Sequence, residues 1–249
     1  MEAAAAPPPQ PPERRLTVGG VIDEALNLYG KHFWVLIGTA AVVFVIAGIV
    51  QGILNDDHGF ILRLVASIVG LIATTLFTGF VVSLVADVRD GKRDFTVGEL
   101  ISNASPAILP LILNGIMYGI CVGIGLLLLI VPGLFLITIW AVVAPAIVAE
   151  RRGPVEAFGR SYELVKGNGW IVFGAIVVAF LILILVGFFA ALIGAAIGNL
   201  GGTIVFAVLA NILVAPFPAL VASTLFFELG GTHQATAQSA ATPPAAPAV

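Results

Sequence analysis

The chain has 249 residues, of which 59% are apolar and only 10% charged, and its formal net charge is −3. A typical soluble domain carries roughly a quarter charged residues, so this composition excludes a soluble globular protein. The single cysteine, Cys121, excludes a disulfide framework and a thiolate metal site.

The two ends of the chain differ in composition from everything between them. Residues 1–15 are rich in alanine and proline and lack the apolar core of a signal peptide. Residues 231–249 have a similar bias. Neither end can bury enough apolar surface to offset the entropy cost of ordering, so we expect two disordered tails. The predicted membrane domain is residues 16–230.

Between the tails, apolar runs predict six transmembrane helices and therefore an all-α polytopic membrane protein. Each run is long enough to cross a hydrocarbon core about 30 Å thick. The third and fourth runs are separated only by "VPGLF", in which Pro132 and Gly133 predict a turn. The predicted spans are 33–53, 61–86, 107–131, 133–149, 170–194 and 203–227.

Lysine and arginine residues predict the orientation of these spans, because short cytoplasmic loops carry an excess of both. Of the eleven in the chain, only Arg63 falls on the second side of the predicted membrane. Trp34 and Trp170 each open a span on the side where the other ten lie, as expected of interfacial tryptophans. We therefore expect both termini in the cytoplasm. The alanine-, glycine-, valine- and proline-rich composition fits a bacterium with a GC-rich genome. We expect the protein in a bacterial inner membrane.

Repeated motifs divide the membrane domain into units. "LTVGGVI", beginning at Leu16, and "FTVGELI", beginning at Phe95, share four of seven residues. "FWVLIG", ending at Gly38, resembles "GWIVFG", ending at Gly174. The charged residues 150–170 precede the last pair of spans, as the first two motifs precede the earlier pairs. The sequence thus predicts three units, each an amphipathic helix followed by a spanning hairpin.

Apolar residues at helical spacing predict which face of each amphipathic helix is buried. In residues 150–170 the predicted apolar face is Val155, Phe158, Tyr162 and Val165. In the first unit it is Val18, Ile22, Tyr29 and Phe33. Helices of this kind lie along a membrane surface, with their charges among the lipid headgroups, so we expect interfacial helices here.

An acidic residue ends the second span of each unit: Asp87, Glu150 and Glu228. Two interpretations remain open. The acids either mark the exits from the membrane, or they accept hydrogen bonds from a neighbouring helix N-terminus or an arginine and so dock the units together.

The sequence resembles the membrane domain that accompanies glycerophosphodiester phosphodiesterases and that also occurs in stand-alone bacterial proteins. The resemblance covers roughly residues 16–229 and rests on "TVGGVIDEALNLYGKHFW" and on the pattern "VPG…W…AP…E…G…EAF.RS..L..G..W" from Val131 to Trp170. It implies a multi-span fold. It does not imply phosphodiesterase activity, because we expect only a disordered tail where the catalytic domain would follow. The family's Asp-Leu-Arg-like ending is here "FFELGG", which keeps an acid at Glu228 but lacks the arginine.

No motif in the sequence predicts an enzyme. HExxH, GxSxG and a glycine-rich phosphate loop are absent, and the histidines His32, His58 and His233 lie far apart in the chain. We therefore expect no catalytic residues, no metal and no cofactor, and no nucleic-acid partner.

The span interiors contain polar residues but no ionisable group of the kind that proton- or ion-coupled transporters usually carry. The polar residues are Thr74, Thr75, Thr78, Asn114, Tyr118 and Asn211. They either pack helices together or line a route for a solute. A hydrated cavity lined by Asn114, Tyr118 and Asn211 would favour transport, and a dry, close-packed interior would argue against it. Prolines at 110, 145, 216 and 218 either kink the helices or break them near such a cavity.

The sequence thus favours a non-enzymatic integral membrane protein that organises lipids or partner proteins at the cytoplasmic face. The alternative is a transporter or exporter of a neutral or lipid-like solute. Basic residues near an anionic leaflet contribute about 1 kcal/mol each, so they are candidate headgroup contacts unless they only set the topology. The candidates are Arg89, Lys92, Arg93, Arg151, Arg152, Arg160 and Lys166.

Overall fold

A computed structural model describes residues 16–55, 59–89, 98, 105–197 and 200–241. Those residues form helices joined by turns and contain no strand, which confirms the predicted all-α class. Six apolar segments among them are long enough to cross a bilayer, so the chain is a multi-pass membrane protein. The segments are Phe33–Gln51, Ile61–Arg89, Ile108–Leu128, Ile130–Ala149, Gly169–Ala196 and Val205–Gly230.

The helices form three hairpins in chain order, and the return limb of the second and third hairpins is divided into two helices. The first hairpin is α2 (Phe33–Asn55) and α3 (Phe60–Arg89). The second is α5 (Ile108–Leu128), α6 (Ile130–Ile139) and α7 (Val143–Ala149), and the 3₁₀ turn η1 (Ser105–Ala107) precedes it. The third is α9 (Gly169–Ala196), α10 (Leu200–Val214) and α11 (Pro216–Ala241).

Two shorter helices precede the first and third hairpins, as the predicted units require. They are α1 (Val18–Lys31) and α8 (Glu156–Val165). The hydroxyl of Thr17 caps α1 by accepting a hydrogen bond from the Gly20 amide at 3.1 Å. The motif that begins at Phe95 lies outside the described residues, except for Gly98, and so do the predicted tail at 1–15 and residues 242–249 of the second tail. Residues 231–241 of that second tail, expected to be disordered, instead continue α11, since alanine favours a helix.

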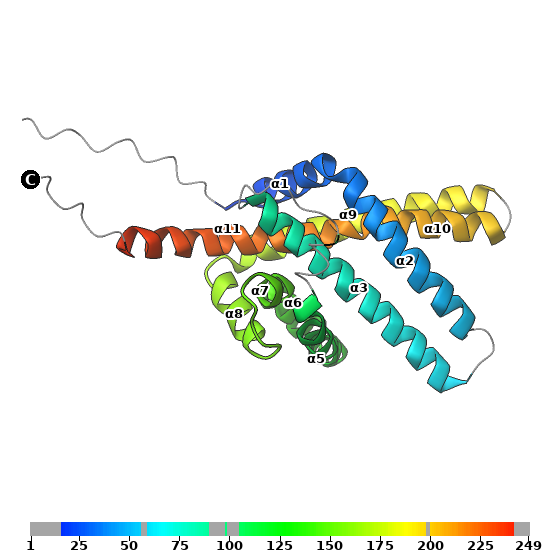
Figure 1. Ribbon diagram of the computed structural model, residues 1–249, viewed down its shortest axis with the longest axis horizontal. Coiled ribbons are helices and arrows are strands. Elements are labelled where there is room, and N and C mark those ends of the chain that lie inside the picture. Colours follow the sequence, from blue (N-terminus) through cyan, green and yellow to red (C-terminus); the bar gives the residue numbers. More distant parts are fainter. Residues whose placement is uncertain (1–15, 56–58, 90–97, 99–104, 198–199, 242–249) are drawn as a thin grey trace, which may run out of the picture.

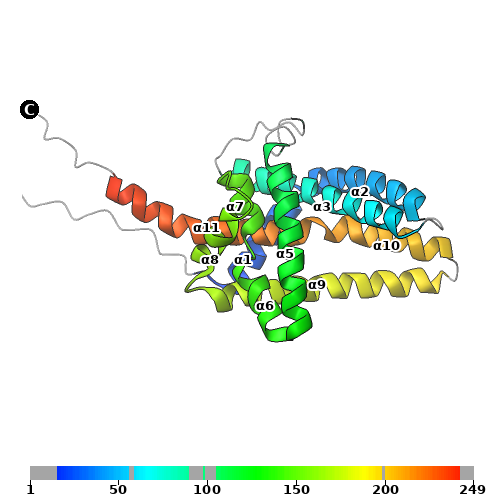
Figure 2. The same ribbon diagram turned by 90° about the horizontal axis from the view of Figure 1, so that it is seen from below.

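The first and third hairpins project to the same side of the molecule (Figures 1 and 2), and α2 contacts α10. The hairpin of α5 and α6 crosses them at a steep angle (Figure 2). Helix α11 runs through the centre and contacts α1, α3, α7, α8 and α9. The three units therefore meet around α11.

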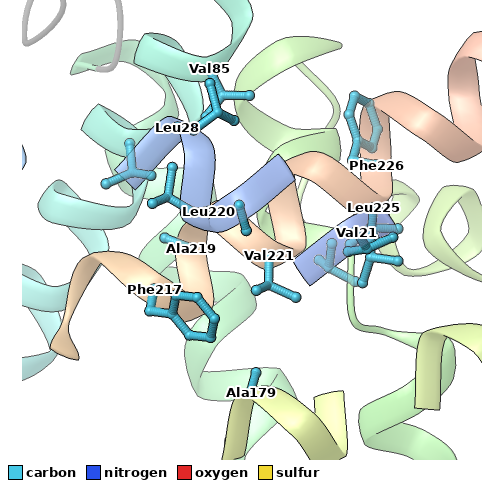
Figure 3. Packing of buried hydrophobic residues seen from close by; sticks show 14 of the residues in the cluster. Val21, Leu28, Val85, Ala179, Phe217, Ala219, Leu220, Val221, Leu225 and Phe226 are labelled. Atoms are coloured by element: carbon cyan, nitrogen blue, oxygen red, sulfur yellow. The ribbon is translucent and has the colours of Figure 1, made fainter. Parts of the chain in front are cut away.

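The hydrophobic core follows from that central position of α11. Leu220 and Leu225 of α11 are almost completely buried, and they share one cluster with Val21 of α1, Val85 of α3 and Ala179 of α9 (Figure 3). Large apolar side chains elsewhere, such as those on the outer side of α9, remain exposed, as expected of surfaces that face lipid.

The turn between the third and fourth spans lies earlier than the sequence predicts. The chain reverses at Leu129, whose backbone is extended, so Pro132 and Gly133 lie inside α6. Pro132 is tolerated in a first helical turn because the amide it lacks would be unpaired there. Gly133 packs directly against α5: a Cβ at this position would come within 2.8 Å of the Leu126 amide nitrogen.

The face of α8 that packs against the rest of the protein coincides only in part with the predicted apolar face, because Val165 is buried and Phe158 is partly buried. Ala157, Ser161, Leu164 and Val165 are buried. Val155 and Tyr162 of the predicted face are 64% and 46% exposed. The small side chains of Ala157 and Ser161 allow α8 to approach α6 and α7 closely, and this tertiary contact outweighs the hydrophobicity of the other face.

Candidate functional site

Glu150, one of the three predicted docking acids, joins the end of α7 to α8. Its carboxylate accepts hydrogen bonds from Nε and Nη2 of Arg160 at 2.8–3.0 Å and from Nε of Arg152 at 3.1 Å. Arg160 also lies 3.9 Å from the carboxylate of Glu163. These bonds connect the second unit to the third, which is the contact that the docking interpretation requires.

The electrostatics of this pair follow from its position near the surface. Burial raises the pKa of Glu150. The hydrogen bonds from Arg160 and Arg152 and their positive charges together lower it by more than burial raises it, so the pKa lies below the ordinary value of 4.5. The hydrogen bond to Glu150 in turn raises the pKa of Arg160. Both groups are therefore charged at neutral pH.

The other predicted site residues are distributed over two places. The Arg89 guanidinium lies 5.4 Å above the centre of the Phe227 ring, which links the end of α3 to α11. Arg151, Arg152 and Lys166 are exposed around α8. Asp87 and Glu228 are half-buried near the ends of α3 and of the sixth apolar segment. Lys92 and Arg93 lie outside the described residues.

Ser161 closes the break between α6 and α7. Its hydroxyl donates to the carbonyl of Ile139 at 2.9 Å and accepts from the amide of Val142 at 3.3 Å. In a continuous helix the Ile139 carbonyl would accept from the Val143 amide, which here bonds to Trp140 instead. Ser161 is completely buried, so it satisfies two backbone groups that water cannot reach.

A second contact joins α8 to α5. The side-chain amide of Asn114 donates to the carbonyl of Pro154, just before α8, at 2.8 Å. The indole of Trp140 lies between Tyr118 and Phe158, with ring centroids 6.2 and 4.6 Å apart. The start of the third unit is therefore held against the second by an ion pair, two polar side chains and an aromatic contact.

The break between α10 and α11 is closed from the first unit. The hydroxyl of Tyr29 in α1 donates to the carbonyl of Leu213 at 2.8 Å. Burial raises the pKa of Tyr29, so this donor keeps its proton over the whole physiological pH range. Gly174 of α9 lies against α1 in the same region, because a Cβ there would be 2.8 Å from Cγ2 of Val18.

A pocket of about 490 Å³ lies between the three hairpins, with walls from α3, α5, α9, α11 and the α6–α7 break. Most of its lining is apolar. The polar members are Thr74, Thr75, Thr78, Asn114 and Tyr118, together with the indole of Trp140.

Several polar groups in this lining already have partners within the protein. The hydroxyls of Thr74 and Thr78 donate to the carbonyls of Gly70 and Thr74 at 2.9 and 2.8 Å, and Asn114 donates to Pro154 as described above. Asp, Glu, Lys, Arg and His are absent from the described lining. The pocket therefore suits an uncharged, mainly apolar molecule.

Two of the three residues that the sequence assigned to a cavity, Asn114 and Tyr118, line this pocket. Asn211 does not line it, and its side-chain amide donates to the Ala207 carbonyl within α10 at 2.9 Å. Sequence reasoning missed the roles of Trp140 and Ser161. Within the part of the chain that the structure describes, no group of three His, Cys, Asp or Glu side chains could hold a metal ion.

The model of the uncharacterised protein family UPF0259 matches residues 33–217, from the start of α2 into the first turn of α11. Neither the curated proteins nor the solved structures contain a match.

Proposed function

Because the chain belongs to the uncharacterised protein family UPF0259, whose name states no activity, we propose a function from the site itself. The protein is a non-enzymatic integral membrane protein that organises lipids, holding a lipid-like molecule between its three hairpins. The observation that carries this proposal is the 490 Å³ pocket, which falls within the range of about 300–1,000 Å³ typical of small-molecule sites.

The composition of the pocket wall favours a lipid-like occupant over a polar solute. Leu71, Leu111, Ile176 and Leu183 from three different helices face it. Because each hairpin contributes to the wall, an occupant would contact all three units at once. The exposed Trp34 and Trp170 and the basic residues around α8 support a location of this assembly at the cytoplasmic face.

We propose in addition that the fold is related to the membrane domain of glycerophosphodiester phosphodiesterases. What supports this is the pattern from Val131 to Trp170, whose residues have clear structural roles here. Pro145 follows the helix break, Ser161 closes it, and Glu150 pairs with Arg160. These roles concern folding, so the proposed relationship extends to architecture and not to phosphodiesterase activity.

The principal test measures whether the pocket retains lipid. Native mass spectrometry of the full chain, released gently from its membrane, is expected to show a bound lipid-like molecule. Ala222→Phe would fill the pocket from α11 and is expected to remove it. Ala191→Phe, on the exposed side of α9, is the matched control and should retain it. A parent protein that carries no such molecule would contradict the proposal.

A transporter of a neutral or lipid-like solute is the second candidate, because two broken helices line the pocket. Trp140 and Ala141 come from the first break, and Pro218 follows the second closely. Discontinuous helices commonly surround the binding sites of transporters. Reconstituted vesicles distinguish the two functions: transfer of a fluorescent lipid between leaflets, abolished by Ala222→Phe, would favour transport, and binding without transfer would favour organisation.

A further inference from the structure

The loop from Arg151 to Pro154 lies at one edge of the pocket. Asn114 lines the pocket, and its amide nitrogen is 2.8 Å from the Pro154 carbonyl. Arg152 precedes Pro154 by two residues, and two residues of extended chain span about 7 Å at most. A guanidinium on this loop can therefore reach a group that projects from the pocket.

Positive charge outnumbers negative charge around this loop. Glu150 is bound by both Arg160 and Arg152, and Glu156 lies beside Gly153. Glu163 lies 3.9 Å from Arg160, and counting these three acids against Arg151, Arg152, Arg160 and Lys166 leaves one positive charge. No ion pair involves Arg151 among the described residues. Its exposed side chain is thus available to an anion from outside the protein.

The backbone of Arg151 is unusual. Its φ of +53° is the only positive value at a non-glycine position in the part of the chain that the structure describes. Arg151 follows the C-cap of α7, where glycine is the residue that adopts this conformation at the lowest energy. Glycine at this position would relieve the strain but remove the guanidinium.

The outer face of α8 supports a lipid origin for that anion. Val155 and Tyr162 point away from the protein, and Trp170 is 86% exposed just beyond the helix. Apolar and aromatic side chains arranged in this way suit the boundary between headgroups and acyl chains. Arg151 and Arg152 precede this face directly, so they lie at the level of the headgroups if α8 lies on the membrane.

We infer that the pocket and the Arg151–Pro154 loop form one binding site for an anionic phospholipid. One acyl chain of the lipid occupies the pocket, and the phosphate of the lipid lies against Arg151 and Arg152. This inference rests on the proposed function and adds the charge of the ligand to it.

The test compares lipids with the same acyl chains but different heads. Native mass spectrometry is carried out on the full chain after addition of phosphatidylglycerol, phosphatidylcholine or diacylglycerol. The parent is expected to prefer phosphatidylglycerol. Arg151→Ala combined with Arg152→Ala should reduce that preference about five- to thirtyfold, which corresponds to the binding free energy expected from one or two basic contacts with an anionic lipid. Arg63→Ala, on the opposite side of the predicted membrane, is the matched control and should leave the preference unchanged.

A second variant covers the case in which the double substitution does not fold. Arg151→Gly should unfold no more easily than the parent, because it relieves the strained backbone, and it should still lower the preference for phosphatidylglycerol. Equal retention of all three lipids by the parent, sensitive to Ala222→Phe, would overturn the inference and leave the proposed function standing. An undiminished preference in the arginine variants would also overturn the inference. Absence of any bound lipid would instead refute the proposed function.

Discussion

The breaks between α6 and α7 and between α10 and α11 have the same cause but are closed in different ways. Pro145 and Pro216 lie in the first turn of the helix after each break. Proline lacks an amide hydrogen, and its ring clashes with the carbonyl four residues earlier, which for Pro145 is that of Ala141. The first break is closed by buried Ser161 from α8 through two hydrogen bonds, and the second by Tyr29 from α1 through one.

This difference indicates how tightly each surface helix is attached. Ser161 of α8 satisfies two buried backbone groups at the break. Glu150 binds Arg160 of α8, and Asn114 binds the Pro154 carbonyl just before the helix. Helix α1 places a hydroxyl at a half-buried edge, and much of its attachment comes from packing of residues such as Val21 and Leu28. We therefore expect α8 to be essential to the helix break that it closes, and α1 to contribute stability that is more easily lost.

The largest effect is expected at Ser161. Ser161→Ala leaves the Ile139 carbonyl and the Val142 amide without partners, at about 1–3 kcal/mol for each buried group, so a loss of about 2–6 kcal/mol is expected. Ser223→Ala is the matched control, because Ser223 is equally buried but donates only to the Ala219 carbonyl within its own helix. Equilibrium unfolding in detergent, followed by circular dichroism, measures both. Equal losses would show that the break does not depend on α8.

Packing of α1 is tested at two glycines in matching positions of the repeated motif. Gly174→Ala is expected to cost about 1–3 kcal/mol, because the new methyl group would lie 2.8 Å from Val18 Cγ2. Gly38→Ala meets no atom within 4 Å and should be neutral or stabilising by up to about 1 kcal/mol. The same unfolding experiment compares them. If Gly174→Ala is as stable as Gly38→Ala, α1 is not tightly packed against α9.

The sequence allowed correct prediction of the features that local composition determines. Six spans could be located because the length of an apolar run is a property of the run itself. Pro145 and Pro216 could be recognised as sites of a kink or break, because the missing amide is intrinsic to proline. Thr74, Asn114 and Tyr118 could be identified as candidate cavity residues because polar groups are few in the spans.

The remaining features depend on contacts between distant residues. Helical periodicity identified Val165 as buried, but it could not show that the small residues Ala157 and Ser161 pack α8 against α6 and α7 while Val155 and Tyr162 stay exposed. The sequence does not specify which acid pairs with Arg160, because its partner Glu150 lies ten residues away across a turn. The reversal at Leu129 was missed because Pro132 and Gly133 carry the stronger local turn signal.

A smaller effect is expected at Tyr29. Tyr29→Phe removes one hydrogen bond to the Leu213 carbonyl and should lower the free energy of unfolding by about 0.5–1.5 kcal/mol. Hydrogen exchange should increase in α1 more than in α8. Tyr162→Phe, at an exposed position of α8, controls for loss of a phenolic hydroxyl. Unchanged exchange in α1 would mean that packing alone holds this helix.

The smallest effect concerns pH and acts on α8 only. Because the pKa of Glu150 is lowered in the folded state, its contribution to stability is fully present above the ordinary value of 4.5 and is lost as the pH falls through the lowered pKa. The pair lies near the surface, so we expect a loss of no more than about 1 kcal/mol. Hydrogen exchange of α8 should therefore increase relative to α1 between neutral and acidic pH. In Glu150→Gln the faster hydrogen exchange of α8 relative to α1 should already be present at neutral pH, and acidification should not increase it. A variant that keeps the pH dependence of the parent would assign it to another acid.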